Sequence, residues 1–128
     1  MRKLKLSKKS QVRKRFLRNL LSSLILFEQV KTTSPRAKAL RGEMQSLISR
    51  LKSMDNEVNT KRYIASTLYG GAKEKAFDLK DSFKDVKLYK LGRRLGDNAE
   101  TVLVKLVREE AAPKVEKKEE KVKSGKKK

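Results

Sequence analysis

Apolar side chains recur at intervals of three and four residues through much of the chain, which is the spacing of amphipathic helices. The pattern predicts a first helix over residues 11–27, with the apolar positions Val12, Phe16, Leu17, Leu20, Leu21, Leu24, Ile25 and Phe27. Residues 28–33 contain β-branched side chains without a helical period and predict a short strand. Ser34 suits the N-cap and Pro35 the first position of a second helix, which the pattern extends to Lys52.

Two shorter helices are predicted next. Asp55 is expected to cap a third helix that carries the apolar positions Val58, Ile64, Ala65 and Leu68. The glycine pair 70–71 is expected to end this helix, because glycine readily adopts the left-handed conformation at a helix C-terminus. A fourth helix is predicted over residues 72–83 from the spacing of Ala76, Phe77, Leu79 and Phe83.

Beyond residue 83 the period shortens to the alternation of strands. Residues 86–95 and 101–107 therefore predict two strands, and the turn-forming residues 96–98 between them predict a hairpin. An early strand beside a late hairpin indicates one small mixed sheet covered on one face by helices. The expected fold class is therefore α+β, with two layers and the order helix, strand, three helices, two strands.

The predicted domain occupies residues 11–107 and has a charged extension on each side. Residues 1–10 hold five basic side chains and little that could pack, which predicts an extended arm. Residues 108–128 consist mainly of Lys and Glu, a composition typical of a disordered tail.

No membrane span or signal peptide is predicted. The apolar run of residues 20–27 is too short to cross a bilayer, and Ser22 and Ser23 interrupt it. No small-residue cleavage site follows the basic start, although an acid-poor, Arg- and Ser-rich start leaves a mitochondrial presequence as an alternative. We therefore expect a cytoplasmic protein with no membrane partner.

Charge changes this picture more than any other property of the composition. The chain carries 35 basic and 15 acidic side chains, a formal net charge of +20 at pH 7. Residues 1–42 contain 13 basic side chains and a single acid, Glu28. A charge of this size destabilises a compact monomer by self-repulsion and attracts polyanions. Nucleic acid, an anionic membrane or an acidic protein could compensate it.

Candidate chemistry is sparse, because the chain contains neither cysteine nor histidine. This composition removes disulfides, thiolate metal sites and the commonest general base. Most carboxylates alternate with lysines at ordinary helix-surface spacing, as in Lys73-Glu74-Lys75. We therefore expect no enzyme activity, no metal or other cofactor and no small-molecule substrate.

Three groups of residues predict contacts with nucleic-acid phosphates. The first comprises the arm and the edge of the first helix, Arg2, Lys3, Lys5, Lys8, Lys9, Arg13, Lys14, Arg15 and Arg18. The second surrounds the start of the second helix and combines hydroxyls, cations and a helix N-terminus, at Lys31, Thr32, Thr33, Arg36, Lys38 and Arg41. The third lies beside the hairpin, at Lys87, Lys90, Arg93 and Arg94, with Asp97 expected to form the turn.

Three stretches resemble the bacterial-type family of ribosomal protein seventeen of the large subunit. They are Arg18-Asn19 with the leucine-rich segment after it, Lys31-Thr32-Thr33-Ser34-Pro35-Arg36-Ala37-Lys38, and Lys90-Leu91-Gly92-Arg93-Arg94-Leu95-Gly96-Asp97-Asn98-Ala99. Their order and separation agree with the family as well, over about residues 7–107. The chain departs from the family where Arg2-Lys3-Leu4 and Val12 replace its usual Arg-His-Arg start and histidine.

The resemblance implies a helix–strand–three-helix–two-strand fold bound to large-subunit ribosomal RNA. It also implies a place among neighbouring ribosomal proteins near the nascent-chain exit. The RNA contacts that it implies are Arg18, Asn19, Lys31, Thr32, Thr33, Lys38, Arg93, Arg94 and Gly96. An organellar ribosome stays open as an alternative to the cytoplasmic one.

Two other functions compete with ribosomal RNA binding. One is a free-standing nucleic-acid regulator, such as a DNA-architectural factor, since the charge argument applies to any polyanion. The other is a membrane-active basic amphipathic segment at residues 10–27. This second alternative requires that the apolar stripe of the first helix is not used in a core.

Overall fold

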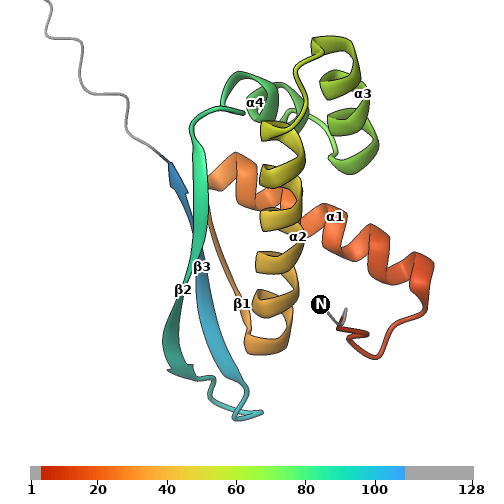
Figure 1. Ribbon diagram of the computed structural model, residues 1–128. Coiled ribbons are helices and arrows are strands. Elements are labelled where there is room, and N and C mark those ends of the chain that lie inside the picture. Colours follow the sequence, from red (N-terminus) through yellow and green to blue (C-terminus); the bar gives the residue numbers. More distant parts are fainter. Residues whose placement is uncertain (1–3, 109–128) are drawn as a thin grey trace, which may run out of the picture.

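The computed structural model describes residues 4–108, and the elements of this range follow the predicted order (Figure 1). They are α1 (Ser10–Phe27), β1 (Gln29–Thr33), α2 (Ser34–Lys52), α3 (Glu57–Thr67), α4 (Ala72–Asp78), β2 (Phe83–Arg93) and β3 (Glu100–Arg108). Arg108, assigned above to the tail, is thus the last residue of β3. Arg2 and Lys3 of the predicted arm lie outside the described residues, as do residues 109–128 of the predicted tail.

The α+β class is confirmed, but the sheet is antiparallel throughout rather than mixed. Its strand order is β1-β3-β2, and both neighbours of β3 pair with it in the antiparallel sense. β1 and β2 therefore run in the same direction. Because β3 separates them, they do not form the parallel pair that a mixed sheet requires.

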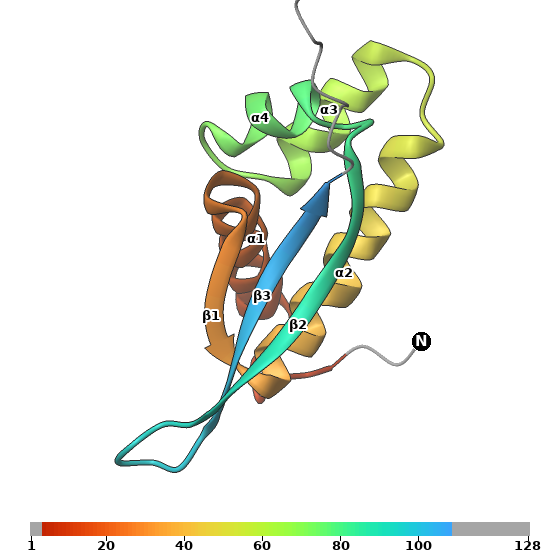
Figure 2. The ribbon, with the colours of Figure 1, turned by 90° about the vertical axis from the view of Figure 1, so that its left-hand side faces the viewer.

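Helices cover one face of the sheet, and no element of residues 4–108 covers the other face (Figures 1 and 2). The inward face of β3 consists of Val102, Val104 and Leu106, which are all buried. They pack with the buried stripes of α1 and α2, to which Leu24, Ile25, Leu40, Met44 and Leu47 belong. Each such side chain contributes roughly 1.5–3 kcal/mol of transfer free energy, so this layer provides most of the stability.

The starts of α2 and α3 differ from the prediction by one residue each. Thr33 is the N-cap of α2 and Ser34 its first helical residue. At α3 the cap is Asn56 instead of Asp55, and its side chain accepts a hydrogen bond of 2.9 Å from the Val58 amide. Val58 is 55% exposed, although it is one of the apolar positions of the predicted helix. The buried face of α3 is set by Thr60 and Ile64, one helical turn apart, and Val58 lies off this face.

The fourth helix is shorter than predicted, and Phe83 belongs to β2. α4 ends at Asp78, and Phe83 and Val86 are both fully buried in the sheet. A register shift between Phe83 and Asp85 sets the successive inward residues Phe83 and Val86 three positions apart instead of two. This β-bulge explains the error, because it imitates helical spacing at the start of a strand.

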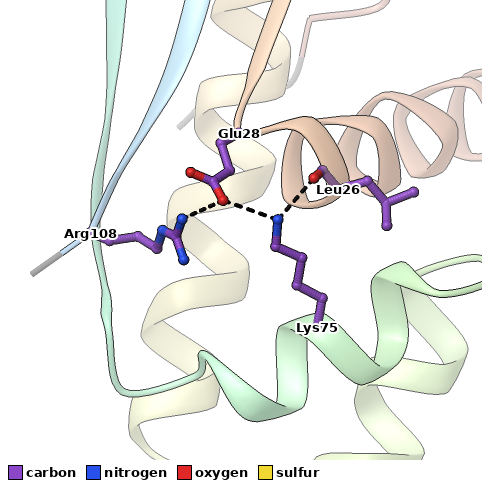
Figure 3. A network of polar contacts seen from close by, with 4 residues as sticks. All are labelled: Leu26, Glu28, Lys75 and Arg108. Atoms are coloured by element: carbon purple, nitrogen blue, oxygen red, sulfur yellow. Dashed lines mark hydrogen bonds and ion pairs between the residues drawn. The ribbon is translucent and has the colours of Figure 1, made fainter. Parts of the chain in front are cut away.

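A polar cluster closes the corner between α1 and β1 (Figure 3). Glu28, with φ 62°, connects the two elements, and its amide donates to the Leu24 carbonyl at 2.8 Å. Its carboxylate binds Arg108 at the end of β3 and Lys75 of α4, the latter at 3.0 Å. Lys75 also donates to the Leu26 carbonyl at 2.8 Å. Glu28 thus links four elements.

We predict that Glu28→Gln lowers the free energy of unfolding by about 1 kcal/mol at pH 7, since these ion pairs are partly screened by solvent. The hydrogen bond from Lys75, with help from Arg108, lowers the pKa of Glu28 from its usual 4.5. The contribution of Glu28 is therefore complete above pH 4.5 and is lost as the pH falls through the folded-state pKa.

Urea unfolding followed by circular dichroism at pH 7 and at pH 3 measures this difference. Glu43→Gln on α2 is the control, because no ion pair of Glu43 occurs within residues 4–108. A Glu28→Gln variant as stable as this control at pH 7 would contradict the assignment.

Candidate nucleic-acid interface

Positive charge is concentrated at one end of the molecule. Residues 4–42 hold eleven basic side chains and one acid, whereas residues 55–81 hold five of each. The basic arm, the start of α2 and the β2–β3 hairpin lie at the end opposite α3 and α4 (Figure 1). The fold therefore separates a basic end from an electrically balanced one.

The arm and α2 meet on the ring of Phe16, which joins the first two predicted groups. The ammonium of Lys8 lies 5.4 Å from the ring centroid, and the guanidinium carbon of Arg36 lies 5.3 Å from it. Both distances are within the range of cation–π attraction. The sequence pattern assigned Phe16 only to the apolar stripe, yet the half-buried ring also positions two cations.

A groove of about 790 Å³ lies between the arm, α1, α2 and β2. Leu17 and Leu88 contribute apolar surface to it, and three predicted contact residues line it, namely Arg13, Lys38 and Arg41. Glu43 also lines this groove. Its cations outnumber this acid, so the groove suits a ligand with spaced negative charges.

Arg41 has one weak internal partner. A nitrogen of its guanidinium lies 4.0 Å from a carboxylate oxygen of Asp85, and both side chains are almost half exposed. The amide of Val86 and the side chain of Gln45 lower the pKa of Asp85 more than Arg41 does. Arg41 therefore retains donors for an external anion.

The third predicted group occupies the hairpin between β2 and β3. Arg94 donates to both carboxylate oxygens of Asp97, from Nε to Oδ1 at 3.1 Å and from Nη2 to Oδ2. Asp97 also accepts a hydrogen bond of 3.2 Å from the Ala99 amide. This geometry is that of a turn-forming aspartate, as expected for Asp97. Gly92 and Gly96 both have a φ of 102°, a conformation that favours glycine.

Arg93 differs from its neighbour, because its exposed guanidinium makes no ion pair or hydrogen bond with any described residue. Glu100, at the base of the hairpin, connects this group with α2. The Lys90 ammonium lies 3.3 Å from a carboxylate oxygen of Glu100. Its hydrogen bond, followed by one from Ser34, lowers the pKa of Glu100, and the charge of Lys38 lowers it further by a smaller amount. The hairpin base and the start of α2 thus form one continuous surface.

Arg18 is the predicted contact with the most extensive internal role. Its guanidinium donates two hydrogen bonds of 2.8 Å, to the carbonyls of Ala65 and Leu68 at the end of α3. It also stacks on Tyr69, with 3.8 Å between the guanidinium carbon and the ring centroid. Because these contacts join α1 to α3, Arg18 has a structural role in addition to any contact with RNA.

The other predicted residues are less engaged. Exposed side chains without an ion pair among residues 4–108 are Lys5, Lys9, Lys14, Arg15, Asn19 and Lys31. Thr32 pairs with the inward Val102, so it faces the helices, whereas Thr33 faces the opposite side. The two hydroxyls therefore do not converge on one anion.

Comparison with known proteins gives one consistent result. The model of the family "Ribosomal protein L17" matches residues 16–107. The chain belongs to the ribosomal protein L17 family. This assignment confirms the resemblance seen in the sequence and the prediction that the protein is not an enzyme.

Two curated members of the L17 family illustrate the similarity. Both are named "Large ribosomal subunit protein bL17". The protein of Staphylococcus carnosus (strain TM300) is 33% identical over 120 residues, which cover 80% of this chain and 97% of the relative. The protein of Syntrophotalea carbinolica is 32% identical, and the match covers 88% of this chain and 76% of the relative.

None of the helices in residues 4–108 has the length and hydrophobicity of a membrane-spanning segment. That range also holds no cluster of acidic side chains suited to a metal ion.

We predict that Arg18→Lys lowers the free energy of unfolding by about 1–2 kcal/mol. Lysine cannot donate to both carbonyls and stack on the ring, and hydrogen bonds from charged groups contribute roughly this amount. Thermal or urea unfolding measures the change, with Arg15→Lys on the exposed side of α1 as the matched control. Equal stability of the two variants would show that the contacts of Arg18 do not hold α3.

We also predict that the hairpin titrates at unusually low pH. The hydrogen bond from Arg94, followed by that from the Ala99 amide, lowers the pKa of Asp97 to about 2. The ¹⁵N–¹H signal of Ala99 should therefore shift with a midpoint near pH 2, and Asp97→Asn should abolish this transition. A midpoint near the ordinary value of 3.8 would mean that Arg94 is free in solution.

Proposed function

We propose that this chain is a structural constituent of the large ribosomal subunit that binds and scaffolds its RNA by neutralising phosphates. The observation that carries this proposal is the separation of charge, with eleven cations and a single acid in residues 4–42. That acid, Glu28, is bound to Lys75 and Arg108 at the far end of the sheet. The lack of another acid in residues 4–42 supports compensation of the basic end by an external polyanion.

The interface offers two kinds of phosphate contact. Arg13, Lys38 and Arg41 surround the groove and suit a run of phosphates along a nucleic-acid backbone. Arg93, whose guanidinium has no ion pair or hydrogen bond among residues 4–108, suits a bidentate contact with one phosphate. Lys8 and Arg36, positioned on Phe16, extend the surface toward the arm.

The large subunit is the preferred setting because the names of both relatives specify it. We extend the proposal to a ribosome in the cytoplasm, to a site near the nascent-chain exit and to protein neighbours there, as the family resemblance implies. Exposed apolar side chains support protein neighbours, since Leu95 is 99% and Phe27 71% exposed in a chain otherwise rich in charge.

The membrane alternative requires that the apolar stripe of the first helix is left out of the core, and this condition is not met. The apolar stripe of α1 is used in the core, where Leu21, Leu24 and Ile25 are at most 3% exposed. The helix therefore has no continuous apolar face to place in a bilayer while the protein is folded.

We predict that Arg13→Gln/Lys38→Gln/Arg41→Gln weakens binding to deproteinised large-subunit RNA and flattens its salt dependence. Each phosphate contact contributes roughly 0.7–0.9 to the slope of log K against log salt, so three lost contacts reduce the slope by about 2. Filter binding at several salt concentrations measures both quantities. Lys52→Gln/Arg62→Gln/Lys73→Gln, at the balanced end, is the matched control.

Duplex DNA separates the proposal from the DNA-architectural alternative. At about 0.2 M salt the protein should prefer folded ribosomal RNA to duplex DNA, since non-specific binding is strongly weakened by salt. Equal affinities would favour the alternative. A groove variant that behaves like the control variant would contradict the proposed phosphate contacts.

A further inference from the structure

The uncovered face of the sheet carries side chains that the proposed contacts do not use. Strand alternation and register place two rows of partners across it, with Lys105 between Gln29 and Lys87, and Leu103 between Lys31 and Tyr89. Gln29, Lys31, Lys87, Tyr89 and Lys105 are exposed, and Leu103 is half-buried. We call these six residues the open face, and Figure 2 views the sheet from this side.

The electrostatics of the open face are unfavourable in the isolated protein. Lys87 and Lys105 are direct partners on neighbouring strands, and like charges in this position destabilise a sheet. No carboxylate of residues 4–108 forms an ion pair with Lys31, Lys87 or Lys105. Lys87 does have a weak electrostatic effect on Asp85, but the side chain of Gln45 on α2 holds that carboxylate. The three lysines therefore have a net charge without an ion-pair partner in the part of the chain that the structure describes.

An aromatic ring lies beside these cations. Tyr89 is 46% exposed. Its register partner on β3 is the half-buried Leu103, whose side chain lies on the same face of the sheet. None of the cation–π contacts among residues 4–108 involves Tyr89, whereas Phe16 and Phe77 each have two and Tyr63 and Tyr69 each have one. Only the register, and no local sequence pattern, shows that Tyr89 lies on the uncovered face.

We propose that the open face is a second RNA-binding surface, on which Lys31, Lys87 and Lys105 hold phosphates and Tyr89 stacks on a base. Exposed aromatic rings beside cations are the usual platform for an unpaired nucleotide. An RNA strand fits both features, since it supplies negative charges and planar bases along one direction. This inference rests on the proposed ribosomal RNA binding and extends it.

The open face and the groove lie on opposite sides of the sheet. The groove is lined by Leu88, which pairs with the inward Val104 on the helix side. Tyr89, the next residue, faces the other way. One chain therefore contacts two separate RNA segments and bridges them, which is a physical basis for scaffolding.

The first test removes charge from the open face. Lys31→Gln/Lys87→Gln/Lys105→Gln should bind deproteinised large-subunit RNA at least tenfold more weakly than Lys52→Gln/Arg62→Gln/Lys73→Gln in the same buffer. The slope of log K against log salt should fall by about 2 relative to that control. The free open-face variant should also unfold at a higher urea concentration than the wild-type protein, because the repulsion between Lys87 and Lys105 is removed.

The second test detects stacking directly. The chain contains no tryptophan, so Tyr89→Trp introduces a single fluorescent probe on the open face. Its fluorescence should be quenched when the same RNA binds, whereas a Tyr63→Trp probe on α3 should change little. Tyr89→Phe should retain the affinity, and Tyr89→Ala should lose about tenfold, in line with the contribution of one stacked base.

The outcomes separate this inference from the function on which it depends. If the wild-type protein binds the RNA, but the open-face and control variants bind equally and the probe at position 89 is not quenched, the open face is not an RNA surface. The same conclusion follows if the open-face variant binds naked RNA normally and fails only to join subunits, which would indicate a protein neighbour. If the wild-type protein does not bind the RNA, the proposed function itself fails.

Discussion

The placement of Glu28 constrains how this protein can neutralise its charge. It is the only acid among the first 42 residues, beside 13 basic side chains. The fold uses it to join the end of α1 and the start of β1 to α4 and to the end of β3, so it cannot also offset the arm or the start of α2. Three carboxylates near the basic end, those of Asp85, Asp97 and Glu100, are held by hydrogen bonds within the fold, whereas Glu43 lines the groove. The proposed binding to a polyanion therefore rests on how the acids are placed as well as on their number.

The order of the elements and the main core positions could be predicted because they depend on periodicity. Leu24, Leu40, Met44 and Val104 are buried as the spacing indicates. The errors have local physical causes. A bulge gave the start of β2 a helical spacing, so Phe83 was assigned to α4. The mixed sheet was wrong because strand order depends on how distant segments pair, which no local pattern determines.

The candidate site shows the same division. Sequence identified the three basic groups, but it could not show that Phe16 joins the first to the second, or that Glu100 connects the second to the third. It also could not distinguish Arg93 from Arg94, which is bound by Asp97, or predict that Arg18 supports α3. The alternation of residues 101–107 turns Lys105 away from the core, yet only the register places it beside Lys87. Contacts between elements, rather than residue types, decide which cations are available.

The two ends of the protein differ in net charge, and the two faces of its sheet differ in whether helices cover them. The α3–α4 end is electrically balanced and is fastened by Arg18 and Lys75. The opposite end presents several cations, such as Arg93 and Lys14, that form no ion pair within residues 4–108. Sedimentation of a cell lysate through a sucrose gradient, with detection of this chain in each fraction, tests the central claim most directly. We expect the protein in the fractions of the large subunit and of whole ribosomes. Its recovery at the top of the gradient, as a free monomer, would contradict the account.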